Sequence, residues 1–128
     1  MVKLLEAVPN FSEGRDIETV RELVDVIAAK DVDVVDWSAD PDHNRAVVTY
    51  IGDPRSVEDA SVTAAGFALE HFDLRRHEGV HPRVGALDVL PFVPLQGLGM
   101  DDAVASAHRV GREIARLGVP VFFYGQAS

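Results

Sequence analysis

Residues 32–51 read VDVVDWSADPDHNRAVVTYI, two strand-like runs joined by a polar turn. Val32–Trp37 and Ala46–Ile51 are rich in the β-branched and aromatic residues that favour strands. Asp, Pro and Asn between them, in residues 38–45, favour a tight reversal of the chain. The short connection therefore predicts an antiparallel hairpin in the middle of the chain.

A strand and a helix are expected before this hairpin. Leu4–Val8 is a short, mainly apolar run that predicts the first strand. Asp16 suits a helix N-cap, and an apolar stripe after it predicts a helix. The stripe consists of Ile17, Val20, Val24, Ile27 and Ala28. Between the strand and the helix, residues 9–15 have strong turn chemistry, and this loop either only reverses the chain or also supplies ligand contacts.

A second helix is expected directly after the hairpin. Ser56 and Asp59, three residues apart, resemble a capping box with Asp in place of Glu, which predicts the start of the helix. The helix is expected to end near Phe72 or Leu74. Its apolar face consists of Val57, Ala60, Ala64, Phe67 and Ala68.

Two strands and a third helix complete the prediction. Residues 87–95 predict a fourth strand, and its two prolines place it at a sheet edge or at a bend. The third helix starts at Asp101 or Asp102 and is stopped by Gly118 at the C′ position. Its inner face consists of Val104, Ala107, Gly111, Ile114 and Ala115. Residues 119–124 are apolar and predict the last strand.

The predicted order of elements is β-α-β-β-α-β-α-β, without an internal repeat or linker. Its first six elements are those of the ferredoxin-like split βαβ fold, an antiparallel sheet with helices on one face. We therefore expect an α+β protein, a ferredoxin-like sandwich extended by a further helix and strand. With 47% hydrophobic content, residues 1–128 have the size of a single domain with a workable core.

The composition argues against several classes of function. The chain has no cysteine, and therefore no disulfide framework and no cysteine-based nucleophile or zinc site; this fits a reducing compartment, and we expect a cytoplasmic protein. No signal peptide is recognised at the start, and no apolar run approaches the length needed to span a bilayer. The formal net charge of −9 argues against a nucleic-acid or anionic-membrane surface. An anionic small molecule would need local arginines, for which the candidates are Arg45, Arg75, Arg76 and Arg83.

Residues 77–95 carry more chemistry than a structural segment needs. They begin HEGVHPRVGALDV, with two histidines, an arginine and two glycines before an apolar run. Imidazoles titrate near neutral pH, an arginine binds carboxylates with two parallel hydrogen bonds, and glycine lets the backbone approach a ligand. The hairpin turn likewise contains His43 and Arg45, which turn formation does not require. Both segments are therefore candidates for a functional site.

The residues 77–81 also match the H-E-x-x-H pattern of zinc proteases. That site needs a helix that places both histidines on one face. Gly79 lies between them, and Pro82 disfavours the helical conformation at His81. We therefore expect no metal site here, and a zinc hydrolase built on this pattern stays as an alternative that metal analysis of the purified protein would test.

Three motifs, in this order, resemble one family. They are VPNFSEG at residues 8–14, the pair Asn44–Arg45 at the start of the third strand, and HxGxHPRxGAxDVxPFxP at residues 77–94. Together with VPVFFYG at residues 119–125 they resemble the N-terminal subdomain of glutamate formimidoyltransferase, and the resemblance covers essentially the whole chain. Members of that family continue into a second lobe, so this chain looks like either a truncated form without that lobe or a short stand-alone relative.

The resemblance implies a folate-dependent transferase of histidine degradation. Such enzymes move the formimino group of N-formimino-L-glutamate onto N5 of tetrahydrofolate, a co-substrate, in a cleft between two lobes that often belong to a homodimer. We therefore expect these two small molecules as partners, with a homo-oligomer or a missing C-terminal lobe, and neither nucleic acid nor membrane. The family's catalytic histidine lies in its His-Pro-Arg triplet, which implies that His81 is catalytic.

The chemistry of the residues agrees with this implication. N5 must lose a proton as it attacks the amidine carbon, and the departing glutamate nitrogen must gain one, so a single imidazole can serve both steps. Arg45 and Arg83 are candidates for carboxylate contacts, and Gly85 leaves room for close approach. Neutral hydrogen bonds are expected from Asn10, Ser12, His43 and Asn44. A non-catalytic module that binds folate or an amino acid is the alternative, because half of the cleft is missing.

Overall fold

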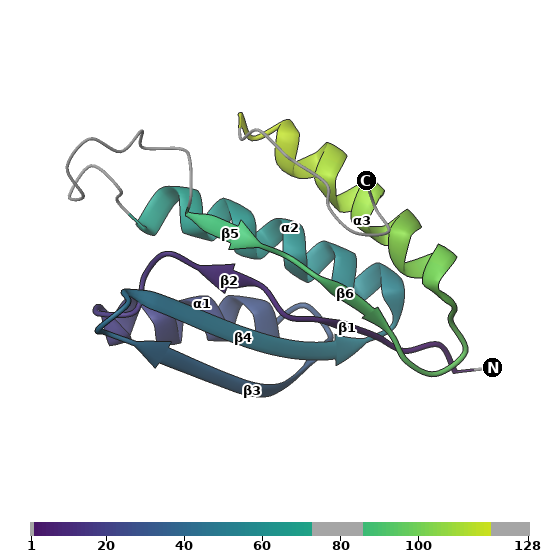
Figure 1. Ribbon diagram of the computed structural model, residues 1–128, viewed down its shortest axis with the longest axis horizontal. Helices are drawn as coiled ribbons and strands as arrows, with labels where there is room; N and C mark the ends of the chain where they lie inside the picture. Colours follow the sequence, from purple (N-terminus) through teal and green to yellow (C-terminus); the bar gives the residue numbers. More distant parts are fainter. Residues whose placement is uncertain (1, 73–85, 119–128) are drawn as a thin grey trace.

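The structure, a computed structural model, describes residues 2–72 and 86–118 (Figure 1). The elements in these ranges are β1 Leu5–Ala7, β2 Asn10–Phe11, α1 Ile17–Ala28, β3 Asp33–Asp40, β4 Arg45–Gly52, α2 Pro54–His71, β5 Leu87–Val89, β6 Phe92–Pro94 and α3 Met100–Ala115. The predicted last strand, residues 119–124, lies outside the described residues. Within the described part of the chain, no helix has both the length and the apolar character needed to cross a membrane.

The described strands form one antiparallel sheet. It has four rows, where a row is either a single strand or two short strands that follow each other along the same neighbour. β3 is one edge and pairs with β4, while β4 pairs on its other side with β1 and β2, which follow each other along it. β6 and β5 pair in turn with β1 and β2 and form the opposite edge. The row formed by β1 and β2 comes first in the sequence. It lies inside the sheet, between β4 and the row formed by β5 and β6. This is the split βαβ order, so the predicted ferredoxin-like α+β fold is confirmed.

The central hairpin is confirmed, and its strands are longer than predicted. β3 pairs with β4 up to Asp40 and Arg45, so the turn contains only residues 41–44. Asn44 closes the turn with a φ of 51°, in the left-handed region that Asn adopts more readily than most residues. The polar segment, residues 38–45, thus contributes half of its residues to strands and half to the reversal of the chain.

Prolines interrupt two neighbouring rows of the sheet. Pro9 separates β1 from β2, and Pro91 separates β6 from β5, because proline has no N–H to donate to a neighbouring strand. The rows stay together across this gap through hydrogen bonds from Val8 N to the Pro91 carbonyl (3.1 Å) and from Val48 N to the Pro9 carbonyl (3.2 Å). The predicted bend of the fourth strand is confirmed, and among the described strands it lies at an edge of the sheet. The first strand is shorter than predicted, and the expected loop after it begins as strand β2.

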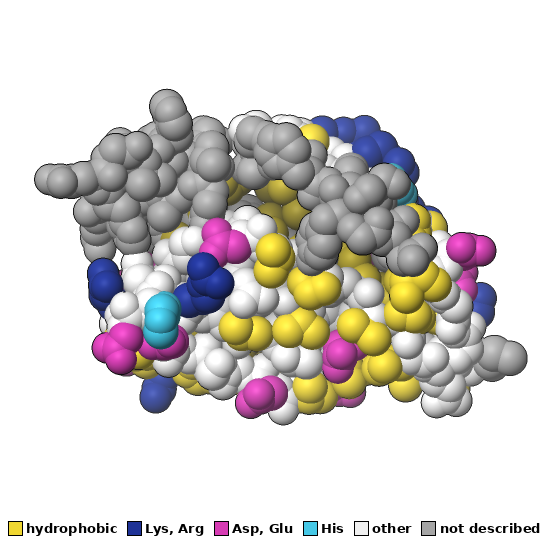
Figure 2. All heavy atoms as spheres, viewed as in Figure 1, with side chains coloured by type: hydrophobic (Ala, Val, Ile, Leu, Met, Phe, Trp, Pro, Cys, Tyr) yellow, Lys and Arg dark blue, Asp and Glu magenta, His cyan; other side chains and the backbone are white. Residues whose placement is uncertain are grey.

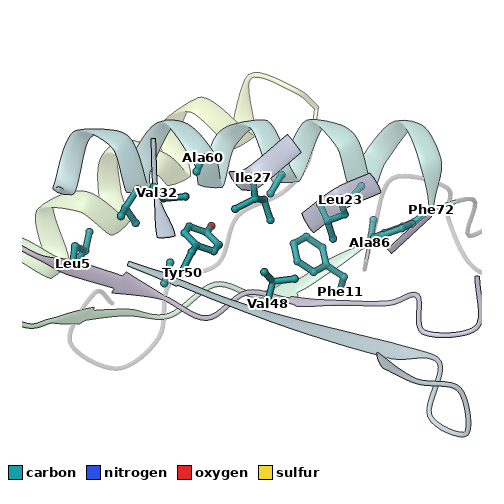
Figure 3. Packing of buried hydrophobic residues seen from close by; sticks show 14 of the residues in the cluster. Leu5, Phe11, Leu23, Ile27, Val32, Val48, Tyr50, Ala60, Phe72 and Ala86 are labelled. Carbon is teal, nitrogen blue, oxygen red and sulfur yellow. The ribbon is translucent and has the colours of Figure 1, made fainter. Parts of the chain in front are cut away.

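The core lies between the sheet and the helices α1 and α2, which cover one of its faces (Figures 1 and 3). Its fully buried members include Leu5, Phe11, Leu23, Ile27, Val48, Tyr50, Ala60 and Phe72. α3 packs against α2 through a second, smaller cluster of Ala65, Val110 and Ile114. The opposite face of the sheet is not covered by the described helices (Figure 1).

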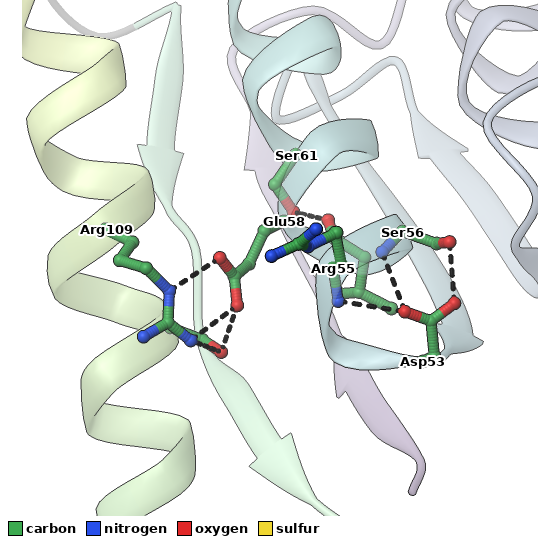
Figure 4. Close-up of polar contacts among 8 residues, drawn as sticks. Asp53, Arg55, Ser56, Glu58, Ser61 and Arg109 are labelled. Atoms are coloured by element: carbon green, nitrogen blue, oxygen red, sulfur yellow. Dashed lines mark hydrogen bonds and ion pairs between the residues drawn. The ribbon is translucent and has the colours of Figure 1, made fainter.

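The start of α2 corrects a prediction. Its N-cap is Asp53, whose carboxylate accepts from the backbone N–H groups of Arg55 (3.0 Å) and Ser56 (3.2 Å) (Figure 4). Pro54 occupies the first helical position, where a missing N–H costs nothing. The predicted capping box of Ser56 and Asp59 is therefore wrong. The Ser56 hydroxyl instead donates to Asp53 Oδ2 at 2.7 Å, from within the first turn.

The other two helices lie where the periodicity predicts them, but their buried faces differ from the predicted stripes. In α1 the buried residues are Val20, Leu23 and Ile27, with Ile17 and Ala28 exposed. In α3 they are Ala103, Ser106, Val110, Gly111 and Ile114, largely one position earlier than predicted. Other apolar residues flank each stripe, such as Val24 in α1 and Val104 in α3, so periodicity alone does not choose between neighbouring faces. The predicted Asp16 N-cap is confirmed by its bond from the Thr19 N–H, at 3.2 Å.

Candidate functional site

The β2–α1 loop and the turn of the β3–β4 hairpin are joined to each other. The backbone N–H of Gly14 donates to Asn44 Oδ1 at 3.0 Å, and Nε of Arg15 donates to the Pro41 carbonyl at 2.9 Å. Glycine is required for this approach, because a Cβ on Gly14 would clash with the backbone nitrogen and oxygen of Arg45. Two segments that were predicted separately as sources of ligand contacts therefore form one continuous surface.

Strand β5 brings a third segment to the same place. The Ser12 hydroxyl donates to Asp88 Oδ1 at 2.9 Å, although the two residues are 76 positions apart. Arg45 Nη2 lies 3.6 Å from Asp88 Oδ2. The backbone N–H of Ser12 donates to the Ala86 carbonyl at 3.1 Å. One carboxylate thus contacts both the early loop and the first residue of β4.

The guanidinium of Arg45 remains accessible in this arrangement. Its side chain is 55% exposed, whereas that of Asp88 is 27% exposed. A guanidinium carries five N–H donors in a planar fork, and one of its nitrogens faces Asp88. The exposed part of Arg45 therefore suits a carboxylate or another anion that approaches from solvent.

The two asparagines of the motifs hold backbone in place. Asn10 Nδ2 donates to the Val8 carbonyl at 3.2 Å, across the position where Pro9 interrupts the row. Asn44 Oδ1 accepts from the Gly14 N–H, as described above. These bonds give both side chains a structural task, in addition to the ligand contacts predicted for them.

His43 stands on the exposed tip of the hairpin turn. Its Nδ1 lies 2.6 Å from Asp40 Oδ2, and the two side chains are 78% and 51% exposed. The hydrogen bond from the His43 ring lowers the pKa of the Asp40 carboxyl, which also accepts from backbone N–H groups of the turn. Because Nδ1 is engaged, Nε2 is the ring nitrogen that can contact a ligand.

These polar groups lie at one end of the uncovered sheet face. Figure 2 shows basic, acidic and histidine side chains together at that end, and apolar side chains with a few acidic ones along the rest of the visible face. The strand register places Val47 beside Asn10 and Val89 in one line across this face. Ile51 lies beside Glu6 and Val93 in another. The face therefore offers charged groups at one end and a mainly apolar surface beside them.

The structure brings together only part of the predicted site. Ser12 and Arg45 meet at Asp88, with Asn10 on the adjoining strand β2 and with His43 and Asn44 in the hairpin turn. The predicted His81, Arg83 and Gly85 lie outside the described residues, as does the zinc pattern at residues 77–81. In the ranges 2–72 and 86–118, no group of three or more histidine and acidic residues could hold a metal ion.

Asp88 is the site residue that sequence reasoning missed. It belongs to the long histidine motif, but a single acid in a strand is typical of a solvated strand face. The pairing of β2 with β5 places it beside Ser12, and the pairing of β2 with β4 places both near Arg45. No local pattern carries that information, because it depends on which rows are neighbours.

Comparison with known proteins agrees with the resemblance of the motifs. Residues 4–128 match the model of the "Formiminotransferase domain, N-terminal subdomain". The chain is 43% identical over 129 residues to glutamate formimidoyltransferase of Thermoplasma acidophilum, an alignment that covers 99% of this chain and 43% of that protein. It is 39% identical over 130 residues to the protein of that name from Streptococcus pyogenes, covering all of this chain and 44% of the relative.

A longer relative matches equally well. The formimidoyltransferase-cyclodeaminase of Gallus gallus is 43% identical over 130 residues, which cover the whole of this chain and 24% of that protein. The chain thus spans less than half the length of the relatives it matches. Since the family model covers nearly every residue and the motifs of the site lie within it, the chain belongs to the formiminotransferase family, as its N-terminal subdomain.

Proposed function

We propose that this chain is the N-terminal, catalytic half of a glutamate formimidoyltransferase. It transfers the formimino group of N-formimino-L-glutamate to N5 of tetrahydrofolate. The observation that carries the proposal is the meeting of three family motifs, represented by Ser12, Arg45 and Asp88, at one place on the uncovered sheet face. Two relatives that match all or nearly all of the chain have the name glutamate formimidoyltransferase.

The proposed catalytic residue is His81, acting as general base and then general acid. N5 attacks the amidine carbon, a C–N5 bond forms, and the imidazole takes the N5 proton. The bond between that carbon and the glutamate nitrogen then breaks, and the imidazolium returns the proton to the departing nitrogen. A side chain with a pKa near the operating pH suits both transfers. Ala86, whose carbonyl accepts from the Ser12 N–H, is the first residue of the described range 86–118. His81 precedes it by only five positions in the sequence, which supports a role of His81 at this surface.

The proposed binding residues divide by charge. Arg45 and Arg83 pair with substrate carboxylates, which would otherwise be repelled by a chain with a net charge of −9. Asn10, Ser12, His43 and Asn44 supply neutral hydrogen bonds, and Gly85 leaves room for the substrate. The cytoplasmic location, the homo-oligomer and a C-terminal lobe that completes the cleft belong to the same proposal.

A second candidate is a binding module without catalysis. The chain spans only 43% of its Thermoplasma relative, and the activity in that relative's name belongs to the whole protein. Such a module binds a folate or an amino acid, and its affinity does not depend on the imidazole of His81.

The deciding experiment is a formimino-transfer assay with the purified chain, formiminoglutamate and tetrahydrofolate, in which the product is read after acid conversion to its methenyl form. It is run alone and with the remaining part of a family member added in trans. His81→Ala is expected to lower turnover at least about 100-fold, the usual size of a general acid–base contribution. The matched control is His108→Gln, a half-buried histidine on α3 that is not among the residues that meet at Asp88.

The outcomes separate the two candidates. Turnover that persists in His81→Ala would contradict the catalytic assignment. Folate binding that is equal in both proteins, with no turnover in either form of the assay, would favour the binding module. Loss of activity in His108→Gln as well would indicate a general loss of folding, which circular dichroism of each variant would detect.

A further inference from the structure

We propose that Asp88 is a positioning residue that orients the Ser12 hydroxyl and the Arg45 guanidinium. In this orientation Ser12 accepts a hydrogen bond from the amidine group of the donor, while Arg45 binds a carboxylate. The inference rests on the proposed function of the same surface. Asp88 does not itself contact substrate; it acts through the two side chains on either side of it.

The orientation of the Ser12 hydroxyl follows from its bond to Asp88. An ionised carboxylate only accepts hydrogen bonds, so the hydroxyl donates its single hydrogen to Oδ1 at 2.9 Å. Its lone pairs are then the part left for a ligand. A hydroxyl fixed in this way accepts from an N–H group and has no hydrogen to give to a carboxylate. The formimino group carries such N–H donors, and the carboxylates of glutamate and folate do not.

The other oxygen of Asp88 restrains Arg45. Nη2 lies 3.6 Å from Oδ2, close enough for attraction between the charges, and more than half of the arginine side chain faces solvent. An exposed ion pair of this length contributes little to stability. Its effect is to limit the orientations of a long side chain before a carboxylate arrives, which reduces the ordering that binding requires.

The substitution Asp88→Asn distinguishes positioning from simple electrostatics, because the two predict opposite signs. Removal of a negative charge beside Arg45 makes the surface less acidic, so electrostatics alone predicts tighter binding of the anionic donor. An asparagine at this place turns its carbonyl oxygen toward Arg45 and its amide N–H toward Ser12, so the hydroxyl then accepts from the protein and no longer offers the same lone pair. Positioning therefore predicts weaker binding.

The first measurement is the steady-state kinetics of Asp88→Asn in the transfer assay. The KM for formiminoglutamate is expected to rise about tenfold, as for the loss of one hydrogen bond to a charged or polarised group, with kcat changed less than about threefold. Ser12→Ala is expected to raise KM similarly, and the double variant is expected to be no worse than either single one. Asp36→Asn, which removes the same charge from an exposed position of β3 opposite Thr49, is the matched control and is expected to leave KM unchanged.

A second measurement does not depend on turnover. Relaxation of the Arg45 Nε–H group by nuclear magnetic resonance is expected to show a more mobile guanidinium in Asp88→Asn than in Asp36→Asn or the unchanged chain. Equal mobility in all three, or a KM that falls in Asp88→Asn, would overturn the positioning role. A different result would count against the proposed transferase function alone: no transfer activity in the unsubstituted chain, together with a more mobile Arg45 in Asp88→Asn.

Discussion

Tyr50 is the largest fully buried side chain of the sheet, and its hydroxyl bonds to Ser61 in the part of the chain that the structure describes. It lies 2.7 Å from Ser61 Oγ, and that hydroxyl donates to the Val57 carbonyl, also at 2.7 Å. Because Ser61 gives its only hydrogen to Val57, Tyr50 is the donor of the pair. Burial raises the pKa of Tyr50, more than the bond to Ser61 lowers it, so the phenol keeps the hydrogen that this arrangement needs.

The two partners of this bond are therefore not equivalent. Ser61→Ala leaves the buried Tyr50 hydroxyl without an acceptor and is expected to lower the free energy of unfolding by about 2 kcal/mol. Tyr50→Phe leaves Ser61 bonded to Val57 and is expected to cost about 1 kcal/mol. Urea unfolding of both variants measures the difference. A larger cost for Tyr50→Phe than for Ser61→Ala would contradict the assigned direction of the bond.

The junction of the β2–α1 loop with the hairpin turn depends on one glycine. Gly14→Ala forces a methyl group into the backbone of Arg45 and is expected to destabilise the protein by about 1–3 kcal/mol, as overpacked positions do. Gly66→Ala in α2 is the matched control, since open space surrounds its Cβ and alanine favours a helix by about 0.5–1 kcal/mol. Chemical unfolding should therefore give opposite signs for two identical substitutions. Equal effects would argue against the close approach of loop and turn.

α2 and α3 are joined by a charged pair whose strength depends on pH. Arg109 donates twice to Glu58, both at 2.8 Å, and Ser106 donates to the same carboxylate at 2.7 Å (Figure 4). Burial by itself would raise the pKa of Glu58, but the bonds from Arg109 and Ser106 outweigh it and leave the pKa below its ordinary 4.5. A carboxylate with a lowered pKa contributes its stability above the ordinary pKa and loses it as the pH falls through the folded value.

Removal of the arginine tests this pair at two pH values. Arg109→Ala is expected to cost about 1–2 kcal/mol at neutral pH, because Glu58 is only 17% exposed and keeps its charge, whereas Arg109 is half exposed and partly screened. The cost should shrink below pH 4.5 as Glu58 takes up a proton. Arg116→Ala breaks an exposed pair with Glu113 and should cost at most about 0.5 kcal/mol at either pH. A cost for Arg109→Ala that does not change with pH would contradict the role of Glu58.

At the scale of the whole molecule, the sequence predicts the order of elements and the hairpin because both depend on local periodicity and turn chemistry. It does not predict the N-cap of α2, since Asp53 followed by Pro54 competes with the similar signal at Ser56. The role of Asp88 also needs the order of rows in the sheet, which joins residues far apart in the chain. The two prolines of the sheet illustrate the same limit: each is visible in the sequence, but only the pairing of rows shows that they interrupt neighbouring strands.

The inner position of the first strand has a consequence for the synthesis of the protein. Leu4 exchanges hydrogen bonds with residues 95 and 96, and β1 and β2 meet their second neighbours only in β6 and β5. β1 therefore keeps one unpaired edge until residues 95 and 96 have been translated, because its row is closed by the hydrogen bonds of Leu4 to Leu95 and Gln96. Such an edge is a template for pairing with other chains. Closure of the sheet is thus a late event, and the nascent chain is most exposed to misassembly just before its fourth row emerges.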